Sequence, residues 1–175
     1  MAVSANFSDY SVLIIEDSAL LRGLLRNIMI SFKFNSVTAT PTAEDALRWL
    51  QNNTPDIILT DWLLDGMAGV DFTRHIRMEM KDPIRRLPII MCTAYTDRDR
   101  ILIARDNGVN EILAKPITGS RTYDAFANAL EKPREFIDMP TYVGPDRRRR
   151  QISIGFPDRR GIRKAQASSA STYID

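Results

Sequence analysis

Five polar side chains stand out because each follows or ends a short apolar run of the kind that forms a buried strand. Glu16 and Asp17 follow one run, Asp61 follows another, Thr93 ends a third and Lys115 follows a fourth. In a parallel sheet the carboxyl ends of the strands lie along one edge, where ligands bind. The sequence therefore predicts that these five side chains converge in one crevice.

The three carboxylates define the chemistry of this crevice. Three negative charges at close range repel one another unless a cation neutralises them, and an all-oxygen ligand set suits Mg²⁺. Lys115 adds a fixed positive charge and Thr93 a hydroxyl donor, which together suit the stabilisation of a phosphoryl group. No nucleophile or base other than a carboxylate is evident, so we expect a protein that is not an enzyme.

Short apolar runs alternate with longer segments of helical period, which is typical of a βαβ chain. The expected strands cover 11–15, 35–39, 56–60, 87–93 and 111–114, and the expected helices cover 18–30, 42–52, 70–80, 97–107 and 121–132. Ser18 and Thr42 are placed to cap two helices, and Gly108 to end a third. The predicted fold is α/β, a doubly wound, flavodoxin-like (βα)5 parallel sheet.

Composition limits the alternatives. With 175 residues and 44% apolar content, the chain has room for one domain and an appendage. Its single cysteine, Cys92, lies in an apolar run, which excludes a disulfide framework and argues against a structural zinc site. The N-terminal residues lack the pattern of a signal peptide, and no apolar run reaches spanning length, so we expect a cytoplasmic protein.

Basic charge is concentrated at the C-terminal end. Residues 1–132 carry 15 Lys and Arg against 17 Asp and Glu, whereas residues 133–175 carry 9 against 5. Pro133 and Pro140 interrupt helical continuation where the composition changes. We therefore expect one domain over 9–132 and, over 133–175, an arginine-rich segment that is disordered or flexible until a ligand binds.

This segment contains a duplicated mixed motif, "YVGPDRRRR" and "IGFPDRRG". Arginine pairs bidentately with guanine or phosphate, aspartate accepts hydrogen bonds from a guanine edge, and aromatic rings stack on bases. Cyclic di-GMP combines guanines, phosphates and two-fold symmetry, and it is the ligand that we expect. The predicted binding residues are Tyr142, Asp146, Arg147, Arg148, Arg149, Arg150, Phe156, Asp158, Arg159, Arg160 and Arg163.

Other ligands stay open for the same segment. It could be a solvated basic extension without a dedicated ligand, or it could bind an acidic protein surface or anionic lipid. Nucleic acid matches this segment less well, because a basic segment that contacts only backbone phosphates does not need a repeated aspartate.

The motifs "LIIEDS", "ILTDW", "IIMCTAY" and "ILAKPIT" occur in this order. Over about 9–132 the chain thereby resembles a CheY-type response-regulator receiver domain, which implies a CheY-like fold and a histidine kinase or phosphotransfer protein as partner. The resemblance implies that Asp61 accepts the phosphoryl group, that Asp17, Asp61 and the Leu63 carbonyl bind Mg²⁺, and that Glu16 acts through water. It also implies phosphoryl contacts from Thr93 and Lys115, and a cis Lys115–Pro116 bond.

The chain departs from the family pattern at the position of its aromatic switch residue, which is Ile112 here. Tyr95, two residues after Thr93, could act instead. As a hypothesis, Leu63 and Tyr95 shield the acyl phosphate from water. Trp62 is expected in the loop beside the site.

The receiver with its arginine-rich segment resembles the Cle group of CheY-like cyclic di-GMP effectors. That resemblance implies that nucleotide binding orders the segment and that the liganded protein engages a target such as the flagellar motor switch, through residues 97–132. The alternative function is a single-domain phosphorelay receiver whose basic segment binds nucleic acid or an acidic protein.

Overall fold

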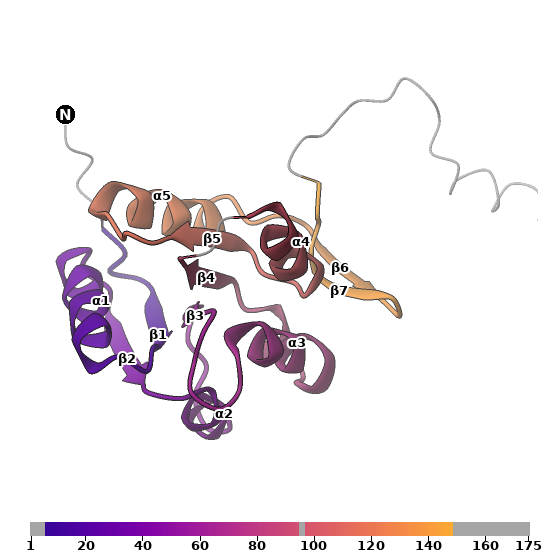
Figure 1. The fold of residues 1–175 in the computed structure, drawn as a ribbon, viewed down its shortest axis with the longest axis horizontal. Coiled ribbons are helices and arrows are strands. Elements are labelled where there is room, and N and C mark those ends of the chain that lie inside the picture. Colours follow the sequence, from indigo (N-terminus) through magenta and orange to yellow (C-terminus); the bar gives the residue numbers. More distant parts are fainter. Residues whose placement is uncertain (1–5, 95–96, 149–175) are drawn as a thin grey trace, which may run out of the picture.

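Five parallel strands form the central sheet of the protein (Figure 1). A computed structural model describes residues 6–94 and 97–148. The strands are β1 (Ser11–Ile15), β2 (Ser36–Thr40), β3 (Ile57–Asp61), β4 (Ile89–Thr93) and β5 (Glu111–Ala114), in the order β2-β1-β3-β4-β5. Strand order reverses at β1, so the carboxyl ends of β1 and β3 lie side by side. The predicted α/β fold class is confirmed.

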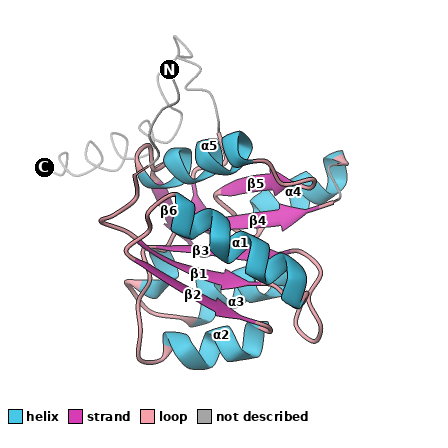
Figure 2. Cartoon of the chain, turned by 90° about the vertical axis from the view of Figure 1, so that its left-hand side faces the viewer, coloured by secondary structure: helices cyan, strands magenta, loops and turns pink. Residues whose placement is uncertain are grey.

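Five helices cover the two faces of the sheet (Figure 2). They are α1 (Ala19–Ser31), α2 (Ala43–Leu50), α3 (Gly69–Glu79), α4 (Arg98–Asp106) and α5 (Gly119–Leu130), with a 3-10 turn, η1 (Ile84–Arg86), before β4. Buried side chains of α1 and α5 share one core cluster with the sheet, and those of α2 and α3 share another. Within the described residues, no helix is both long and apolar enough to cross a membrane.

The capping residues act as the sequence predicts. Ser18 accepts a hydrogen bond from the Leu21 amide, and Thr42 accepts one from the Asp45 amide while its hydroxyl donates to the Asp45 carboxylate. Gly108 has a φ of +89° just after α4, a left-handed conformation that suits glycine. These local signals explain why the observed boundaries lie close to the predicted ones.

Residues beyond α5 form a second, antiparallel sheet of two strands. These strands are β6 (Phe136–Met139) and β7 (Tyr142–Pro145), and all four residues of β7 are buried. The hairpin lies beside α3 and α4 in Figure 1. The sequence predicted no regular structure in 133–175, and the hairpin corrects that prediction for residues 136–145. Pro140 does not break a strand, because it lies in the turn between the two.

A buried arginine of α3 joins the hairpin to the rest of the fold. Arg77 is 1% exposed, and its guanidinium donates to the Gly108 carbonyl (3.1 and 2.9 Å), to Asn110 Oδ1 (3.0 Å) and to the Arg85 carbonyl (2.7 Å). The Phe136 ring of β6 lies 5.6 Å from the guanidinium carbon, within cation–π range. Burial lowers the pKa of Arg77 to about 9, so the side chain is still charged at neutral pH.

Two glycines let the hairpin backbone approach the turn after α4. A Cβ atom on Gly144, whose φ is +153°, would lie 2.7 Å from the Gly108 Cα atom. A Cβ atom on Gly108 would lie 2.8 Å from the Val143 carbonyl oxygen and 2.9 Å from Arg77 Cγ. The two backbones are therefore in direct contact, and neither position has room for a side chain.

Gly144→Ala should weaken the docking of the hairpin, because the added methyl group overlaps Gly108. We expect a loss of about 1–3 kcal/mol in the free energy of unfolding, measured by urea denaturation. Gly23→Ala, in the middle of α1, is the matched control because nothing lies within 4 Å of a Cβ atom there. The control should gain about 0.5–1 kcal/mol. Equal stability of Gly144→Ala and the parent protein would contradict the close contact.

Candidate functional site

The predicted cluster of polar residues forms at the carboxyl ends of the strands. Asp61 is the last residue of β3, Glu16 follows β1, and Lys115 follows β5. The Lys115 ammonium nitrogen lies 2.8 Å from Asp61 Oδ2 and 3.6 Å from Glu16 Oε2. The structure thus brings together three of the five residues that the sequence predicts, with one cation between two carboxylates.

Glu16 is the most buried member of the cluster, at 1% exposed. Its Oε1 accepts a hydrogen bond from the Ser18 amide, whereas its Oε2 has no hydrogen-bond partner. Burial, followed by the charge of Asp61, raises the pKa of Glu16, and the attraction of Lys115 offsets only part of this shift. An ionised Glu16 is therefore energetically costly in the absence of a further cation.

Burial and the neighbouring carboxylates shift the pKa of Lys115 in opposite directions. Burial alone would lower its pKa, but the hydrogen bond and charge of Asp61, with the charge of Glu16, raise it overall. The Lys115 amide also donates to the Thr93 carbonyl at 2.8 Å, which fixes the start of the loop after β5. The Lys115–Pro116 bond is cis, as predicted.

Asp17 faces the loop after β3. Its Oδ2 accepts a hydrogen bond from the Asp65 amide at 3.1 Å. Over residues 6–94 and 97–148, no three His, Cys, Asp or Glu side chains are grouped so that they could hold a metal ion. Leu63, in the same loop, is 55% exposed. The three carboxylates therefore come from the expected strand ends, but Asp17 points to a different partner.

Arg22 also belongs to this site, although the sequence did not indicate it. Arg22 lies in the first turns of α1, and its Nη1 donates to the carbonyl oxygens of Glu16 (2.7 Å) and Asp17 (3.0 Å). It thereby holds the backbone from which both carboxylates project. No side-chain spacing signals this contact, because its acceptors are backbone carbonyl oxygens.

Apolar contacts connect the site with α4. Ile112 packs with Met91, Ala104 and Val109 in a small cluster that also includes Trp62. The Trp62 amide donates to Asp61 Oδ1 at 2.8 Å, so this residue belongs both to the acidic site and to the cluster under α4. Thr93 ends β4 and is 2% exposed. Tyr95 lies outside the described residues.

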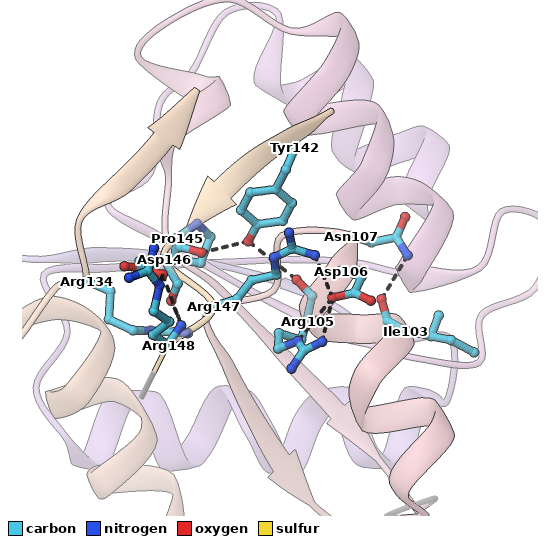
Figure 3. Close-up of polar contacts among 10 residues, drawn as sticks. All are labelled: Ile103, Arg105, Asp106, Asn107, Arg134, Tyr142, Pro145, Asp146, Arg147 and Arg148. Carbon is cyan, nitrogen blue, oxygen red and sulfur yellow. Dashed lines mark hydrogen bonds and ion pairs between the residues drawn. The ribbon is translucent and has the colours of Figure 1, made fainter. Parts of the chain in front are cut away.

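The first copy of the duplicated motif lies on the surface of the receiver-like fold rather than apart from it (Figure 3). Tyr142 is 8% exposed, and its hydroxyl donates to the Pro145 carbonyl at 2.7 Å. The Arg147 guanidinium carbon is 4.4 Å from the centre of the Tyr142 ring, and Arg147 Nη1 is 3.1 Å from Asp106 Oδ1. The expectation that Tyr142 offers a free stacking face to a base is therefore corrected, because the ring is buried in β7 and covered by Arg147.

Asp146 and Arg148 continue this ordered segment. Asp146 Oδ1 accepts a hydrogen bond from the Arg148 amide at 3.0 Å, and the Asp146 carbonyl accepts one from Arg134 Nη1 at 2.8 Å. Arg134 Nη2 also donates to the Asn110 carbonyl, which ties the segment to the residue before β5. The Arg148 side chain is exposed. The remaining predicted binding residues, namely Arg149, Arg150, Phe156, Asp158, Arg159, Arg160 and Arg163, lie outside the described residues.

Comparisons with known proteins place this geometry in context. The response regulator receiver domain family matches residues 12–127. Chemotaxis protein CheY of Pseudomonas aeruginosa is 32% identical over 121 residues, which cover 69% of this chain and 96% of that protein. Chemotaxis protein CheY-3 of Vibrio cholerae is 29% identical over 121 residues, which cover 69% of this chain and 92% of that protein.

Solved structures agree with the sequence matches. A putative response regulator from Chloroflexus aurantiacus superposes with a TM-score of 0.65 at 26% identity, covering 70% of this chain and 98% of that one. The receiver domain of a Pseudomonas aeruginosa sensor histidine kinase, which has a magnesium ion coordinated in its active-site cleft, gives a TM-score of 0.62 at 25% identity and covers 70% and 98%. The hairpin lies beyond the residues that the family matches.

Glu16→Gln should stabilise the protein in metal-free buffer at neutral pH. The raised pKa of Glu16 means that ionisation costs stability as pH rises through the pKa of the folded state, and glutamine removes that cost. The gain in thermal unfolding midpoint should disappear at acid pH, where Glu16 of the parent protein is protonated. Glu79→Gln, at an exposed position in α3, is the control for the loss of one negative charge. A Glu16→Gln protein less stable than the parent at neutral pH would contradict this account.

Proposed function

Because the chain belongs to the response regulator receiver domain family, we propose that Asp61 accepts a phosphoryl group from a histidine kinase or a phosphotransfer protein. A carboxylate oxygen of Asp61 attacks the phosphorus atom, the nitrogen–phosphorus bond of the donor breaks, and an acyl phosphate forms. The observation that carries this assignment is the position of Asp61, buried at the end of β3 and 2.8 Å from the Lys115 ammonium group. Lys115 and Thr93 would contact the phosphoryl oxygens.

We propose that the same site binds a magnesium ion after Asp17 turns toward Asp61, since the described residues do not group three such carboxylates as they stand. The donor set is entirely oxygen: the carboxylates of Asp17 and Asp61, the Leu63 carbonyl, and Glu16 through water. The buried Glu16 Oε2, which has no hydrogen-bond partner, is an acceptor that a hydrated cation would satisfy. Asp17 would first release the Asp65 amide. When bound, the ion would neutralise the charge of the carboxylates and of the incoming phosphoryl group.

Two features of the loops would set the lifetime of the acyl phosphate. Leu63, and Tyr95 outside the described residues, would add apolar bulk around Asp61 that keeps water away. Ile112 has no ring that could rotate on phosphorylation, so Tyr95 is proposed as the switch. The Trp62 contacts with the cluster under α4 would transmit a change at Asp61 to that helix.

We further propose that the duplicated Asp-Arg-Arg units bind cyclic di-GMP. What supports this is the arrangement of the first unit, in which Tyr142 and Asp106 hold Arg147 while Arg148 is exposed beside it. An arginine whose position is already fixed loses less entropy when it binds a guanine or phosphate. Tyr142 would position Arg147, and Phe156 of the second unit would provide the ring on which a guanine base stacks.

The output of the protein is proposed to be binding to a protein partner, such as the flagellar motor switch, through residues 97–132. Two of the matched relatives are chemotaxis proteins, which is consistent with such a target. The C-terminal arginines begin next to α4 and β5, so a ligand there would act directly on this surface. In this account the protein signals by binding and catalyses no reaction on a separate substrate.

Asp61→Asn should abolish phosphorylation by acetyl phosphate in the presence of Mg²⁺, because an amide cannot attack the phosphorus atom. The modified protein is detected by phosphate-affinity electrophoresis. Asp71→Asn, at an exposed position in the first turn of α3, is the control and should be labelled like the parent. Labelling of Asp61→Asn at the parental level would refute the assignment of the phosphoacceptor.

Cyclic di-GMP should bind the full-length protein, and the double variant Arg159→Ala, Arg160→Ala should bind about a hundredfold or more weakly, since each lost charged hydrogen bond costs about 1.5–3 kcal/mol. Isothermal titration calorimetry at two salt concentrations provides the measurement. Arg121→Ala, on the exposed side of α5, is the control for general charge. Equal, salt-sensitive binding of GMP and single-stranded DNA would instead support the alternative, a phosphorelay receiver with a segment that binds any polyanion.

A further inference from the structure

A groove of about 430 Å³ runs between α4 and the edge strand β5. Its apolar lining comes from Ile101, Val109, Ile112 and Ala114, and Arg105 and Arg134 border it. Ile101 is 38% exposed, and Ile103 on the same helix is 46% exposed. An apolar groove of this kind on the surface of a small protein indicates a binding site.

The groove lies beside an open edge of the sheet. β5 pairs with β4, and among residues 6–94 and 97–148 no strand lies on its other side. Ile112 faces α4 in the small cluster there. Native proteins cover or interrupt such an edge, because it attracts extended chains. An extended segment with one apolar side would match both the edge and the groove.

The described chain ends close to the groove. Arg148 lines a pocket together with Glu111, the first residue of β5, and with Arg134, which also lines the groove. Glu135 and Asp146 line the same pocket, so the next residues, Arg149 and Arg150, would start beside carboxylates of opposite charge. The C-terminal segment 149–175 therefore starts within reach of the groove.

The sequence that follows has the pattern of an extended segment with one apolar side. In "QISIGF", residues 151–156, the apolar Ile152, Ile154 and Phe156 alternate with Ser153 and Gly155. Strict alternation is the signature of a half-buried strand. Six extended residues span about 20 Å, and the four residues of β5 span about 13 Å, so the segment is long enough to follow the groove.

We propose that residues 151–156 dock in an extended conformation into the groove between α4 and β5, with Ile152, Ile154 and Phe156 against its apolar lining. Because the segment is tethered three residues away, its effective concentration is about millimolar, which favours it over a second copy or a free partner. Without nucleotide, the docked segment covers part of the surface that is proposed to bind a protein target, and Phe156 would have to leave the groove in order to stack on a base. The inference does not depend on which ligand the arginines bind.

Cysteine cross-linking in the full-length protein tests this docking. Ile101 on α4 is paired with the segment in the double variant Ile101→Cys, Ile154→Cys, and the control is Ile101→Cys, Ser153→Cys, in which the second cysteine falls on the opposite side of the alternation. The native Cys92 is 1% exposed, and burial raises its pKa to about 12, so it should not compete. Both pairs are oxidised without nucleotide and followed on non-reducing gels.

We expect an intrachain disulfide that forms about tenfold or more faster for the Ile154 pair than for the Ser153 pair, since only at position 154 does the Cβ atom of the docked segment point toward Ile101. Equal rates for the two pairs would overturn the proposal, because they would indicate an undocked chain. Disulfide-linked dimers in place of the intrachain product would also overturn it, and would assign the groove to a second copy.

Hydrogen exchange provides a second readout that needs no new cysteine. Ile154→Asp should increase exchange of the Leu113 amide in β5, because a charged side chain cannot enter the apolar groove. Ser153→Asp should leave that amide as in the parent protein. An unchanged Leu113 amide in Ile154→Asp would contradict the docking.

Discussion

The buried Arg77 guanidinium is the interaction on which the C-terminal half of the structure depends. It donates hydrogen bonds to carbonyl oxygens of Gly108 and Arg85 and to the side chain of Asn110, and it lies over the Phe136 ring. A buried charge is tolerated only when its hydrogen-bonding groups are satisfied, so these partners must stay in place together. One side chain therefore fixes the end of α3, the turn after α4 and the hairpin in a common arrangement.

The acidic site also depends on buried charges and their partners, but here the excess charge is negative. Lys115 lies between Asp61 and Glu16, yet the pKa of Glu16 is still raised, so one cation does not neutralise the cluster. A bound metal ion and a phosphoryl group would change this balance most strongly. Trp62 contacts both Asp61 and the cluster under α4, and α4 ends at the turn that Arg77 holds. The proposed phosphorylation site and the arginine motif are thus connected through one helix.

The sequence predicted the sheet, its five helices and the positions of the three carboxylates, because these follow from periodicity, capping residues and polar residues at strand ends. It did not predict the hairpin, whose strands have four residues each, with Pro133 and Pro140 outside the strands and Pro145 as the last residue of β7. The stability of that hairpin comes from Arg77 and Gly108, which are distant in sequence. The burial of Tyr142 and the orientation of Asp17 toward Asp65 were missed for the same reason, since both depend on contacts between segments that are far apart in the chain.

The central claim is that the hairpin carrying the first Asp-Arg-Arg unit folds as one unit with the receiver, around Arg77. Native-state hydrogen exchange of the full-length protein tests it most directly. The account predicts that the hairpin amides of Ile137 and Gly144, which face each other across the ladder, open with the same free energy as those at the end of α4, and that Arg77→Met lowers both together. Hairpin amides that exchange as fast as those of an unstructured peptide, while the end of α4 stays protected, would contradict it.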